Sequence, residues 1–443
     1  MSLTGVVRAR RAGLAIEALT REIQGEVILP FHRDYDRARR VFNGAIDRTP
    51  HAIIRPRDVS DVGAAVAYAR DNDLAVAVRG GGHHVGGWSV IDGGVTIDMS
   101  LMREVLVDQE RRIVRVQGGA LWGDVDRTTQ RYGLGIPGGT VSSVGVGGFT
   151  FGGGIGRLSH AHGLAADNLV SVEMVTADGT VVTASETENE SLFWALRGGG
   201  GKLGVVTSLE FRAHAVPAQV WGGAIGYRIE DAPRALRVMR ELMRSWSRDL
   251  NLSAVIIRKD DRPVLVINAF WCGEPDGGYS AVRPLRAVAT PVIDNYAPAT
   301  YLALQSVDVP GGRRGWETSA FLEELSDASI DALVAYATDA SIAAPRIALL
   351  SVGGAVADVP AAETAFGGRG AEWLVQAGGS WDDAADDAEV RAWVNQLQLT
   401  VAGDATGVGY VNMLADGRPG HSPWMAARLR AVRCEWDRTR LFG

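Results

Sequence analysis

The first half of the chain alternates between apolar and polar residues in short blocks, which predicts short strands and helices in mixed order. Ser60 is expected to cap a helix whose residues Val62, Val66 and Ala69 share one face. Further strands are expected at 74–78, 95–99, 113–117 and 205–212, a hairpin at 170–176 and 181–184 around Asp178-Gly179, and helices at 121–132 and 190–197, with Gly133 after the first of these. This order indicates a mixed α+β fold and no regular array of parallel βαβ units.

The pattern changes after about residue 216, where glycine becomes less frequent and longer helices appear. Helices are expected at 232–248 and 328–341, strands of an antiparallel sheet at 253–257, 264–271, 346–352 and 373–378, and a last strand and helix at 408–413 and 423–436. We therefore divide the chain into an N-terminal helical segment (1–45), a first domain (46–216), a second domain (217–402) and a C-terminal segment (403–443) that returns to the first domain.

Glycine is concentrated in one part of the chain. Of the 55 glycines, 28 lie between Arg79 and Gly204. They form clusters at 80–82, 138–139, 145–148, 152–156 and 198–201, each beside a predicted strand or helix. Because glycine permits positive φ and close backbone approach, the clusters indicate backbone amides wrapped around a ligand. Flexible linkers are the alternative.

Composition and charge exclude several classes of protein. A net charge of −7 gives no basic footprint for nucleic acid, and no apolar stretch approaches the roughly 20 residues of a membrane span. The two cysteines, Cys272 and Cys434, form neither a disulfide framework nor a zinc spacing. Segment 1–19 is interpreted as a helix or a ragged end and not as a signal peptide, so a cytoplasmic location is expected.

The glycine clusters match no single-loop nucleotide motif. A P-loop needs Ser or Thr after its Gly-Lys pair, and Leu203 follows Gly201-Lys202. Gly199-x-Gly201-x-x-Gly204 has the dinucleotide spacing, but it follows a predicted helix and precedes a strand, the reverse of the required order. The remaining hypothesis is a diphosphate surrounded by amides from several separate loops.

Two histidines follow the first glycine cluster directly. Adjacent side chains in a strand or loop point in different directions, so His83 and His84 are not expected to bind one metal together. A histidine beside a ligand-binding loop can contact the ligand, and imidazole is a competent nucleophile. A hydrogen-bonded loop histidine is the alternative. His160 and His162 are interpreted as structural, and no metal site is expected.

Several runs of sequence together resemble one known family. They are AVRGGGH at 77–83, IDGGVTIDMS at 91–100, VGVGG at 144–148, GGGIG at 152–156, GLAADN at 163–168, LFWALRGGGG at 192–201, GVVT at 204–207 and YVN at 410–412. Their order and spacing resemble the berberine-bridge-enzyme-like FAD-linked oxidases, which share the vanillyl-alcohol-oxidase fold with a PCMH-type FAD-binding domain. The likeness is strong over 45–215, weak over 217–400 and present again at 408–414. It is greatest to the bacterial branch that includes 6-hydroxy-D-nicotine oxidase and flavoenzymes of polyketide tailoring.

The resemblance implies that 46–216 is a two-part FAD-binding domain and that 217–402, an antiparallel sheet with helices, is the substrate domain. It implies that FAD lies extended along the glycine loops and that His83 is bonded covalently to the flavin 8α-methyl. The other residues that it places at the cofactor are Arg79, Gly80, Gly81, Gly82, His84, Thr140, Val141, Val144, Gly145, Gly147, Gly148, Gly153, Gly154, Asn168, Gly204, Val205, Val206, Tyr410 and Asn412.

Two valines refine what the resemblance implies. Many relatives form a second covalent flavin bond through a cysteine, and Val141 occupies that position here, so a single link is expected. Val144 aligns with a position that helps to control oxygen access to the flavin, and a valine there usually accompanies oxidase activity. Relatives usually carry Asn-Phe where this chain has Lys202-Leu203; Lys202 is interpreted as solvated, or else as an extra charge near the cofactor.

The activity that the resemblance implies is that of an FAD-linked oxidoreductase. It is expected to remove a hydride from an alcohol or amine carbon of a small organic or secondary-metabolite substrate and to pass the electrons to O2, giving H2O2. The expected partners are this substrate and O2, with no nucleic acid and no membrane.

The expected substrate-side residues are few. Tyr410 is expected to contact the substrate with Asn412 beside it, and Gln376 is expected to face the flavin. Because the strand around Gln376 carries no carboxylate at its centre, a phenol, His84 or no base at all is expected. A dehydrogenase, an oxidative cyclase, a flavin-oxygenating tailoring enzyme and a non-catalytic flavin-binding protein are the alternatives. The substrate, its stereochemistry and the oligomeric state stay open.

Overall fold

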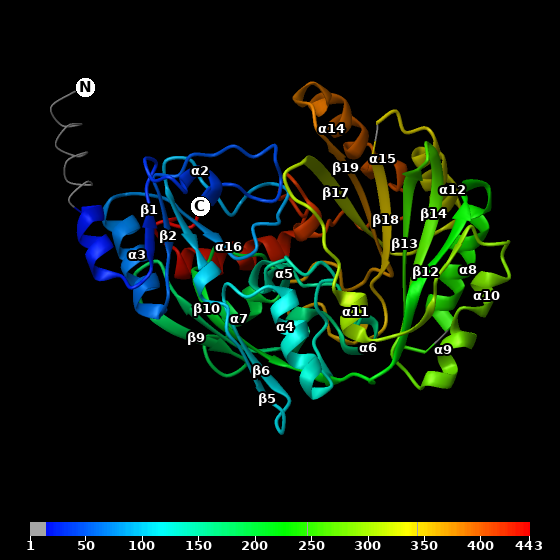
Figure 1. The fold of residues 1–443 in the computed structure, drawn as a ribbon, viewed down its shortest axis with the longest axis horizontal. Helices are drawn as coiled ribbons and strands as arrows, with labels where there is room; N and C mark the ends of the chain where they lie inside the picture. Colours follow the sequence, from blue (N-terminus) through cyan, green and yellow to red (C-terminus); the bar gives the residue numbers. More distant parts are fainter. Residues whose placement is uncertain (1–14, 246, 343) are drawn as a thin grey trace.

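The computed structural model describes residues 15–245, 247–342 and 344–443. Two smaller sheets with short helices form one side of the molecule, and a large sheet backed by longer helices forms the other (Figure 1). The expected helix or ragged end at 1–19 lies mostly outside the described residues, although 15–22 are helical. Among the described residues, no helix is both long and apolar enough to cross a membrane.

The first sheet has four strands in the order β1-β2-β4-β3, with β4 parallel to both β2 and β3. Its elements are β1 (Glu26–Ile28), α2 (Tyr35–Ala38), β2 (Ala52–Arg55), α3 (Val59–Asp71), β3 (Val76–Arg79), β4 (Val95–Asp98) and the 3-10 turn η1 (Met99–Leu101). Helix α3 packs against this sheet and the second one, with Val62 and Val66 fully buried. The prediction of Ser60 as its cap is wrong, because Asp58 accepts the backbone N–H of Asp61 and the Ser60 hydroxyl donates to Asp58.

The second sheet is antiparallel throughout, in the order β5-β6-β10-β8-β9. Its elements are β5 (Val105–Asp108), β6 (Ile113–Gln117), α4 (Trp122–Thr129), η2 (Gln130–Tyr132), β7 (Leu134–Gly135), α5 (Val146–Phe151), α6 (Ser159–His162), η3 (Ala165–Asn168), β8 (Leu169–Val175), β9 (Val181–Ser185), α7 (Glu190–Leu196), β10 (Val205–Arg212) and β11 (His214–Ala215), which pairs with β7. The hairpin predicted around Asp178-Gly179 is confirmed, and Gly133 ends its helix at φ +64°.

The third sheet is large and antiparallel, in the order β15-β12-β14-β13-β18-β19-β17, with β16 also paired to β12. Its strands are β12 (Val220–Arg228), β13 (Leu250–Lys259), β14 (Arg262–Trp271), β15 (Ile293–Asp294), β16 (Ala297–Ala299), β17 (Arg314–Leu322), β18 (Pro345–Ser351) and β19 (Trp373–Trp381). The accompanying helices are η4 (Ile229–Asp231), α8 (Ala232–Ser245), α9 (Pro275–Ala281), α10 (Arg283–Arg286), α11 (Tyr301–Gln305), α12 (Asp327–Thr338), α13 (Ala355–Asp358), η5 (Ala384–Asp386), α14 (Asp387–Asn395) and α15 (Leu397–Thr400).

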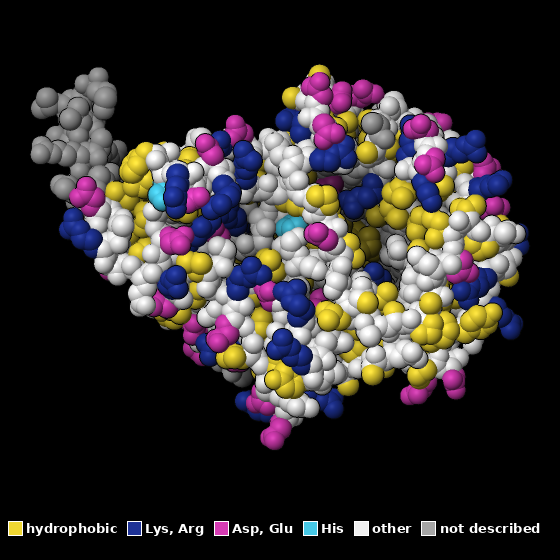
Figure 2. Space-filling model, viewed as in Figure 1, with side chains coloured by type: hydrophobic (Ala, Val, Ile, Leu, Met, Phe, Trp, Pro, Cys, Tyr) yellow, Lys and Arg dark blue, Asp and Glu magenta, His cyan; other side chains and the backbone are white. Residues whose placement is uncertain are grey.

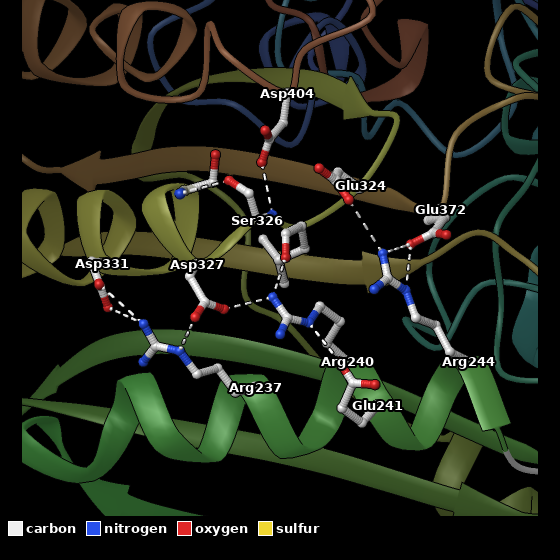
Figure 3. Close-up of polar contacts among 12 residues, drawn as sticks. Arg237, Arg240, Glu241, Arg244, Glu324, Ser326, Asp327, Asp331, Glu372 and Asp404 are labelled. Carbon is white, nitrogen blue, oxygen red and sulfur yellow. Dashed lines mark hydrogen bonds and ion pairs between the residues drawn. The ribbon is translucent and has the colours of Figure 1, made fainter.

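Alternation along β13 gives this sheet two different faces. Leu250, Leu252 and Ala254 are buried in the core beneath α8 and α12, whereas Asn251 and Ser253 point to the opposite face. An ion-pair ladder joins the two covering helices (Figure 3). Its arginines, at one-turn spacing on α8, are Arg237, Arg240 and Arg244, and its carboxylates are Asp327, Asp331, Glu324 and Glu372. Each such surface pair contributes about 0–1 kcal/mol, so the ladder mainly fixes how the helices lie on the sheet.

The C-terminal segment crosses back to the first half of the molecule (Figure 1). The strand predicted at 408–413 is wrong: these residues form a loop and the single 3-10 turn η6 (Val411–Met413). The physical reason is that the segment makes isolated bonds and no continuous ladder: Phe321 on β17 donates its N–H to the Val408 carbonyl, and the Tyr410 N–H donates to the Ser319 hydroxyl. Helix α16 (Pro423–Trp436) follows as predicted and packs on α7. Val76 then donates a backbone hydrogen bond to Leu441. The exact division of the chain at 45, 216 and 402 stays a prediction.

Candidate active site

A cavity of about 1230 Å³ lies between the glycine-rich loops and the large sheet. Figure 2 shows this face of the molecule hollowed between its two parts, with Lys or Arg side chains at the rim. Sites for one small ligand commonly measure about 300–1,000 Å³. The cavity is therefore large enough for a cofactor together with a second, smaller molecule.

Glycine forms one wall of this cavity because the loops there touch backbone to backbone. A Cβ on Gly81 would lie 2.3 Å from the backbone nitrogen of Gly145, so no side chain fits at that position. Gly82, at φ +69°, also adopts a conformation that disfavours other residues. By contrast, a Cβ on Gly148 would meet nothing within 4 Å. The loops thus present backbone to the cavity, as a cofactor with a diphosphate requires.

His83 stands at the end of the first of these loops, against the cavity. Its ring stacks on Phe42, with 4.4 Å between ring centroids. Burial lowers the pKa of His83, so the imidazole is neutral near pH 7. Among the described residues its ring nitrogens have no hydrogen-bond partner, which leaves a lone pair available for bond formation.

His84 is held in a different way. Its ring stacks on Trp88 at 3.8 Å, its Nε2 contacts the carbonyl oxygen of Val411 at 3.0 Å, and its Nδ1 accepts the N–H of Gly86. These two bonds fix a neutral ring with the proton on Nε2. Burial lowers the pKa of His84, although the bond to Val411 opposes this. The lone pair that a base would use is therefore already engaged, and His84 joins the first glycine loop to the C-terminal segment.

Tyr410 is buried between the glycine cluster at 152–156 and strand β17 of the large sheet. Its hydroxyl oxygen accepts hydrogen bonds from the backbone nitrogens of Gly154 at 3.1 Å and Ile155 at 3.4 Å, and from Asn412 Nδ2 at 2.9 Å. Burial raises the pKa of Tyr410 to about 12, against the lowering effect of these three donors. The phenol is therefore protonated at neutral pH, and its O–H is free to donate to a ligand.

Asn412 completes this arrangement. Its Nδ2 also donates to the carbonyl oxygen of Phe149 at 2.9 Å. A Cβ on Gly152 would lie 2.1 Å from Asn412 Oδ1, so the C-terminal segment packs directly against the fourth glycine cluster. The two residues that were expected on the substrate side thus share one hydrogen-bond network and line one cavity.

Gln376 lies on β19 and faces the cavity, beside a carboxylate that the sequence did not predict there. Its Nε2 donates to Glu317 Oε2, and Arg346 Nη2 donates to the same oxygen at 3.2 Å. Burial raises the pKa of Glu317, while Arg346 and Gln376 oppose the shift. Among the described residues no donor reaches Oε1. The strand β19 itself carries no carboxylate, as expected, and Glu317 comes from the neighbouring strand β17, which the sequence did not predict.

The register of the large sheet explains how Glu317 reaches the site. Glu317 pairs with Gly378 and Ser319 pairs with Gln376 across β17 and β19, so these side chains share one face. The Ser319 hydroxyl accepts the N–H of Tyr410 at 3.0 Å. The only sequence signal was the alternation of Gly315, Glu317 and Ser319 with larger residues, which is too short to stand out.

The structure divides the other predicted cofactor residues into two groups. Those that line the cavity with His83 and His84 are Gly80, Gly81, Gly82, Thr140, Val141, Val144, Gly145, Gly147, Gly148, Gly204 and Val206. Those behind the wall are Arg79, Gly153, Gly154, Asn168 and Val205. Arg79 pairs with Asp98 at 2.5 Å, and the Asn168 side chain donates to backbone carbonyls of its own loop. These five hold the loops in place from behind.

Comparison with known proteins identifies the fold and the cofactor. A family model described as an FAD binding domain matches residues 50–185. An uncharacterised FAD-linked oxidoreductase of Bacillus subtilis is 28% identical over 401 residues, 88% of each chain. (R)-6-hydroxynicotine oxidase of Paenarthrobacter nicotinovorans is 29% identical over 316 residues, 71% of this chain and 68% of the relative. The crystal structure of 6-hydroxy-D-nicotine oxidase from Arthrobacter nicotinovorans matches with a TM-score of 0.86 at 25% identity, over 95% of this chain and 97% of the other.

The chain thus carries an FAD-binding domain and is similar to FAD-linked oxidoreductases and to berberine-bridge-enzyme-like proteins. A berberine-bridge-enzyme-like protein of Physcomitrella patens has the same fold, with a TM-score of 0.90 at 23% identity over 97% of each chain. The predicted resemblance and the α+β fold class are confirmed. The chain is an FAD-linked oxidoreductase, and FAD is its cofactor.

Proposed function

We propose that this enzyme is an oxidase that removes a hydride from an alcohol or amine carbon of a small organic molecule and transfers the electrons to O2, giving H2O2. The observation that supports this best is the pair of Glu317 and Tyr410 in one cavity with the glycine loops. Glu317 can accept a proton from the substrate, and Tyr410 can donate a hydrogen bond to it. A substrate of specialised metabolism fits the size of the cavity.

The glycine-rich wall would hold the cofactor. Backbone amides of 80–82 and 145–148 would surround its diphosphate, and Val141 and Val144 would contact its ring system. When bound, FAD supplies the hydride acceptor and the route for electrons to O2. The cradle fits such a group because side chains are excluded at Gly81 and Gly145, where the loops meet.

Glu317 is the proposed base for the substrate O–H or N–H. The carboxylate is held through Oε2 by Gln376 and Arg346, so Oε1 remains to accept a proton. Its raised pKa brings it nearer to neutrality, where a general base transfers protons most effectively. Gln376 is then a positioning residue that orients the carboxylate.

Tyr410 is proposed as a hydrogen-bond donor to the substrate oxygen or nitrogen. Its O–H is free and its oxygen is fixed by three donors, so the proton points away from Gly154, Ile155 and Asn412. The same three donors would also stabilise a phenolate if the phenol gave up its proton. Asn412 orients the phenol.

His83 is the proposed point of covalent attachment. It is neutral, its nitrogens have no partner among the described residues, and it lines the cavity beside the glycine loop. Val141 stands where a second link would need a thiol, so we propose a single bond. Val144 is a half-buried residue of the cavity wall, and we propose that O2 approaches the flavin past it.

A two-part measurement tests the proposal. The purified yellow holoenzyme is mixed without oxygen with a panel of secondary alcohols and cyclic amines, and bleaching of the flavin absorbance is followed. Air is then admitted and H2O2 is quantified. An oxidase gives one H2O2 per substrate oxidised. Bleaching without peroxide would indicate a dehydrogenase, a product retaining oxygen would indicate an oxygenating enzyme, and an absence of bleaching with every compound would contradict the proposal.

A further inference from the structure

The cavity contains an arginine that has no ion-pair or hydrogen-bond partner among the described residues. Arg157 follows the glycine cluster 152–156 and lines the cavity. Among the described residues its guanidinium makes no ion pair and no hydrogen bond, and its Nε is buried. The neighbouring cavity arginines differ, since Arg313 and Arg314 each form a two-bond pair with a carboxylate, Asp382 and Asp387.

A guanidinium that is largely buried and unpaired is unfavourable. It has five N–H donors and cannot lose its charge in the accessible pH range, so removing it from water without supplying an anion opposes folding. Burial lowers the pKa of Arg157, because removal from water disfavours its charged form. Such an arrangement is retained where a ligand supplies the missing negative charge.

Three further polar side chains are unengaged on the roof of the same cavity. Ser253 on β13 lies opposite Asn268 on β14, and Asn251 is two residues along on the same face. All three line the cavity, and none has a side-chain hydrogen bond among the described residues. Ile257 and Leu350 line the roof beyond them, and the polar residues Glu317, Gln376 and Arg346 farther along the sheet are bonded to one another. Asn251, Ser253 and Asn268 thus form a separate group of polar side chains, unbonded in the described part of the chain, at one end of the roof.

That end of the roof is the end beside Arg157. Leu158, the next residue, packs in one cluster with Phe270, and Phe270 pairs with Asn251 across β14 and β13. Arg157 also interacts electrostatically with Tyr301, whose ring lies 5.9 Å from that of Phe270. Arg157 therefore lies at the same end of the cavity as Asn251.

The loop that carries Arg157 also contacts Tyr410, where we propose that the substrate reacts. Ile155, two residues before Arg157, donates its N–H to the Tyr410 hydroxyl at 3.4 Å. Two residues span at most about 7 Å of chain. A molecule bound at Tyr410 can therefore extend a neighbouring group to Arg157.

We propose that Arg157, together with Asn251, Ser253 and Asn268, forms an anion subsite, and that the substrate carries a carboxylate or another oxyanion close to the carbon that is oxidised. This inference rests on the proposed function, since it names the substrate class of the same site. The diphosphate of FAD is the other anion that could neutralise Arg157, and the experiment below separates the two sources.

The test uses the holoenzyme and two probes of one shape, benzoate and benzamide, with binding followed by the change in flavin absorbance and by calorimetry. We expect benzoate to bind more tightly than benzamide by about tenfold or more, the usual worth of a hydrogen bond to a charged group. In R157Q the affinity for benzoate should fall by about tenfold or more while that for benzamide stays unchanged. R157K should retain part of the preference.

Arg258→Gln is the matched control. Arg258 also lines the cavity and has no carboxylate partner in the described part of the chain. It lies at the other end of β13, and its Nη2 donates to the carbonyl of Ala340 at 2.9 Å. R258Q should keep the preference for benzoate. The flavin content and melting temperature of each variant show whether it is folded.

Three results would overturn the inference. They are an equal affinity of the native enzyme for both probes, a preference that survives R157Q, and an R157Q variant that loses flavin while its bound fraction still prefers benzoate, which would assign the arginine to the FAD diphosphate. A failure of the proposed function is distinct, because an enzyme that forms no H2O2 from any compound can still prefer benzoate through Arg157.

Discussion

Gln376 Nε2 donates a hydrogen bond to Oε2 of Glu317, across two neighbouring strands of the large sheet. The bond does two things for the carboxylate. It occupies one oxygen and orients the other, and together with Arg346 it limits how far burial raises the pKa of Glu317. A carboxylate that was wholly unpaired would be protonated and of no use as a base.

Replacing Glu317 with glutamine tests its role. We expect kcat to fall by about 10²–10⁴, the usual contribution of a general base, with flavin content unchanged. In the native enzyme kcat should rise with pH through the raised pKa of Glu317 and then level off, because only the ionised carboxylate accepts a proton. E317Q should lose this acid limb. Glu323→Gln, at an exposed carboxylate just beyond β17, is the control and should leave the profile unchanged.

Replacing His83 with alanine tests the covalent link. The native enzyme should retain its yellow colour in the pellet after acid precipitation, and H83A should release all of its flavin to the supernatant. His84→Ala is the control, since His84 bonds to Val411 and Gly86 and should lose stability but not the covalent flavin. Acid-precipitable flavin in H83A would disprove the attachment at this residue.

Replacing Tyr410 with phenylalanine should affect both stability and activity. The N–H groups of Gly154 and Ile155 would lose their acceptor, and an unsatisfied buried donor costs about 1–3 kcal/mol of unfolding free energy. We expect denaturant unfolding of Y410F to show this loss together with a reduced kcat. Y336F removes a hydroxyl that donates to the Trp393 carbonyl outside the cavity, so it should lower stability alone.

Asp126 on α4 gives a prediction about stability and pH. It is 1% exposed, and neither carboxylate oxygen has a hydrogen-bond partner among the described residues. Burial raises its pKa to about 8 from 3.8, against weaker lowering by Gln305 and Arg127. The folded chain thus keeps a proton that the unfolded chain releases, so unfolding free energy should fall as pH rises from about 4 to 8.

Asp126→Asn removes this dependence. The loss in the native protein is on the order of 5 kcal/mol over that range, from the linkage between pKa and stability. D126N should therefore have the higher melting temperature at pH 8 and above, and little advantage near pH 4. Asp124→Asn is the control on the same helix, at a carboxylate that is ion-paired with Arg103. A native melting temperature that does not change with pH would contradict the expectation.

The sequence predicts the first half of the fold well, for local reasons. The hairpin β8-β9 follows from the turn signal Asp178-Gly179, and β10 has the predicted bounds because its second half, 209–212, alternates between apolar and polar residues. The glycine clusters predict the cavity wall, since only backbone contacts between loops explain glycine at positions such as 81 and 145. Both signals lie within a few residues of what they determine.

The roof of the site is much less predictable. Strand β12 carries Gly222, Gly223 and Gly226, which weaken a strand pattern, and β17 begins with polar residues. Without β17, nothing placed Glu317 beside Gln376, which is 59 residues away in the chain. The sequence also does not predict a role for Arg157. That role depends on the lack of an ion-pair partner, and a sequence does not reveal which charges are paired.

The contact between His84 and Val411 joins residues that are 327 positions apart, and the contact between Gly154 and Tyr410 joins residues 256 apart. During synthesis the ribosome adds about 5–20 residues per second, so the first loop waits many seconds for its closing partner. We therefore expect FAD to bind late in synthesis, once nearly the whole chain has left the ribosome. A nascent polypeptide interrupted before Tyr410 would have its glycine loops but no finished site in which to retain FAD.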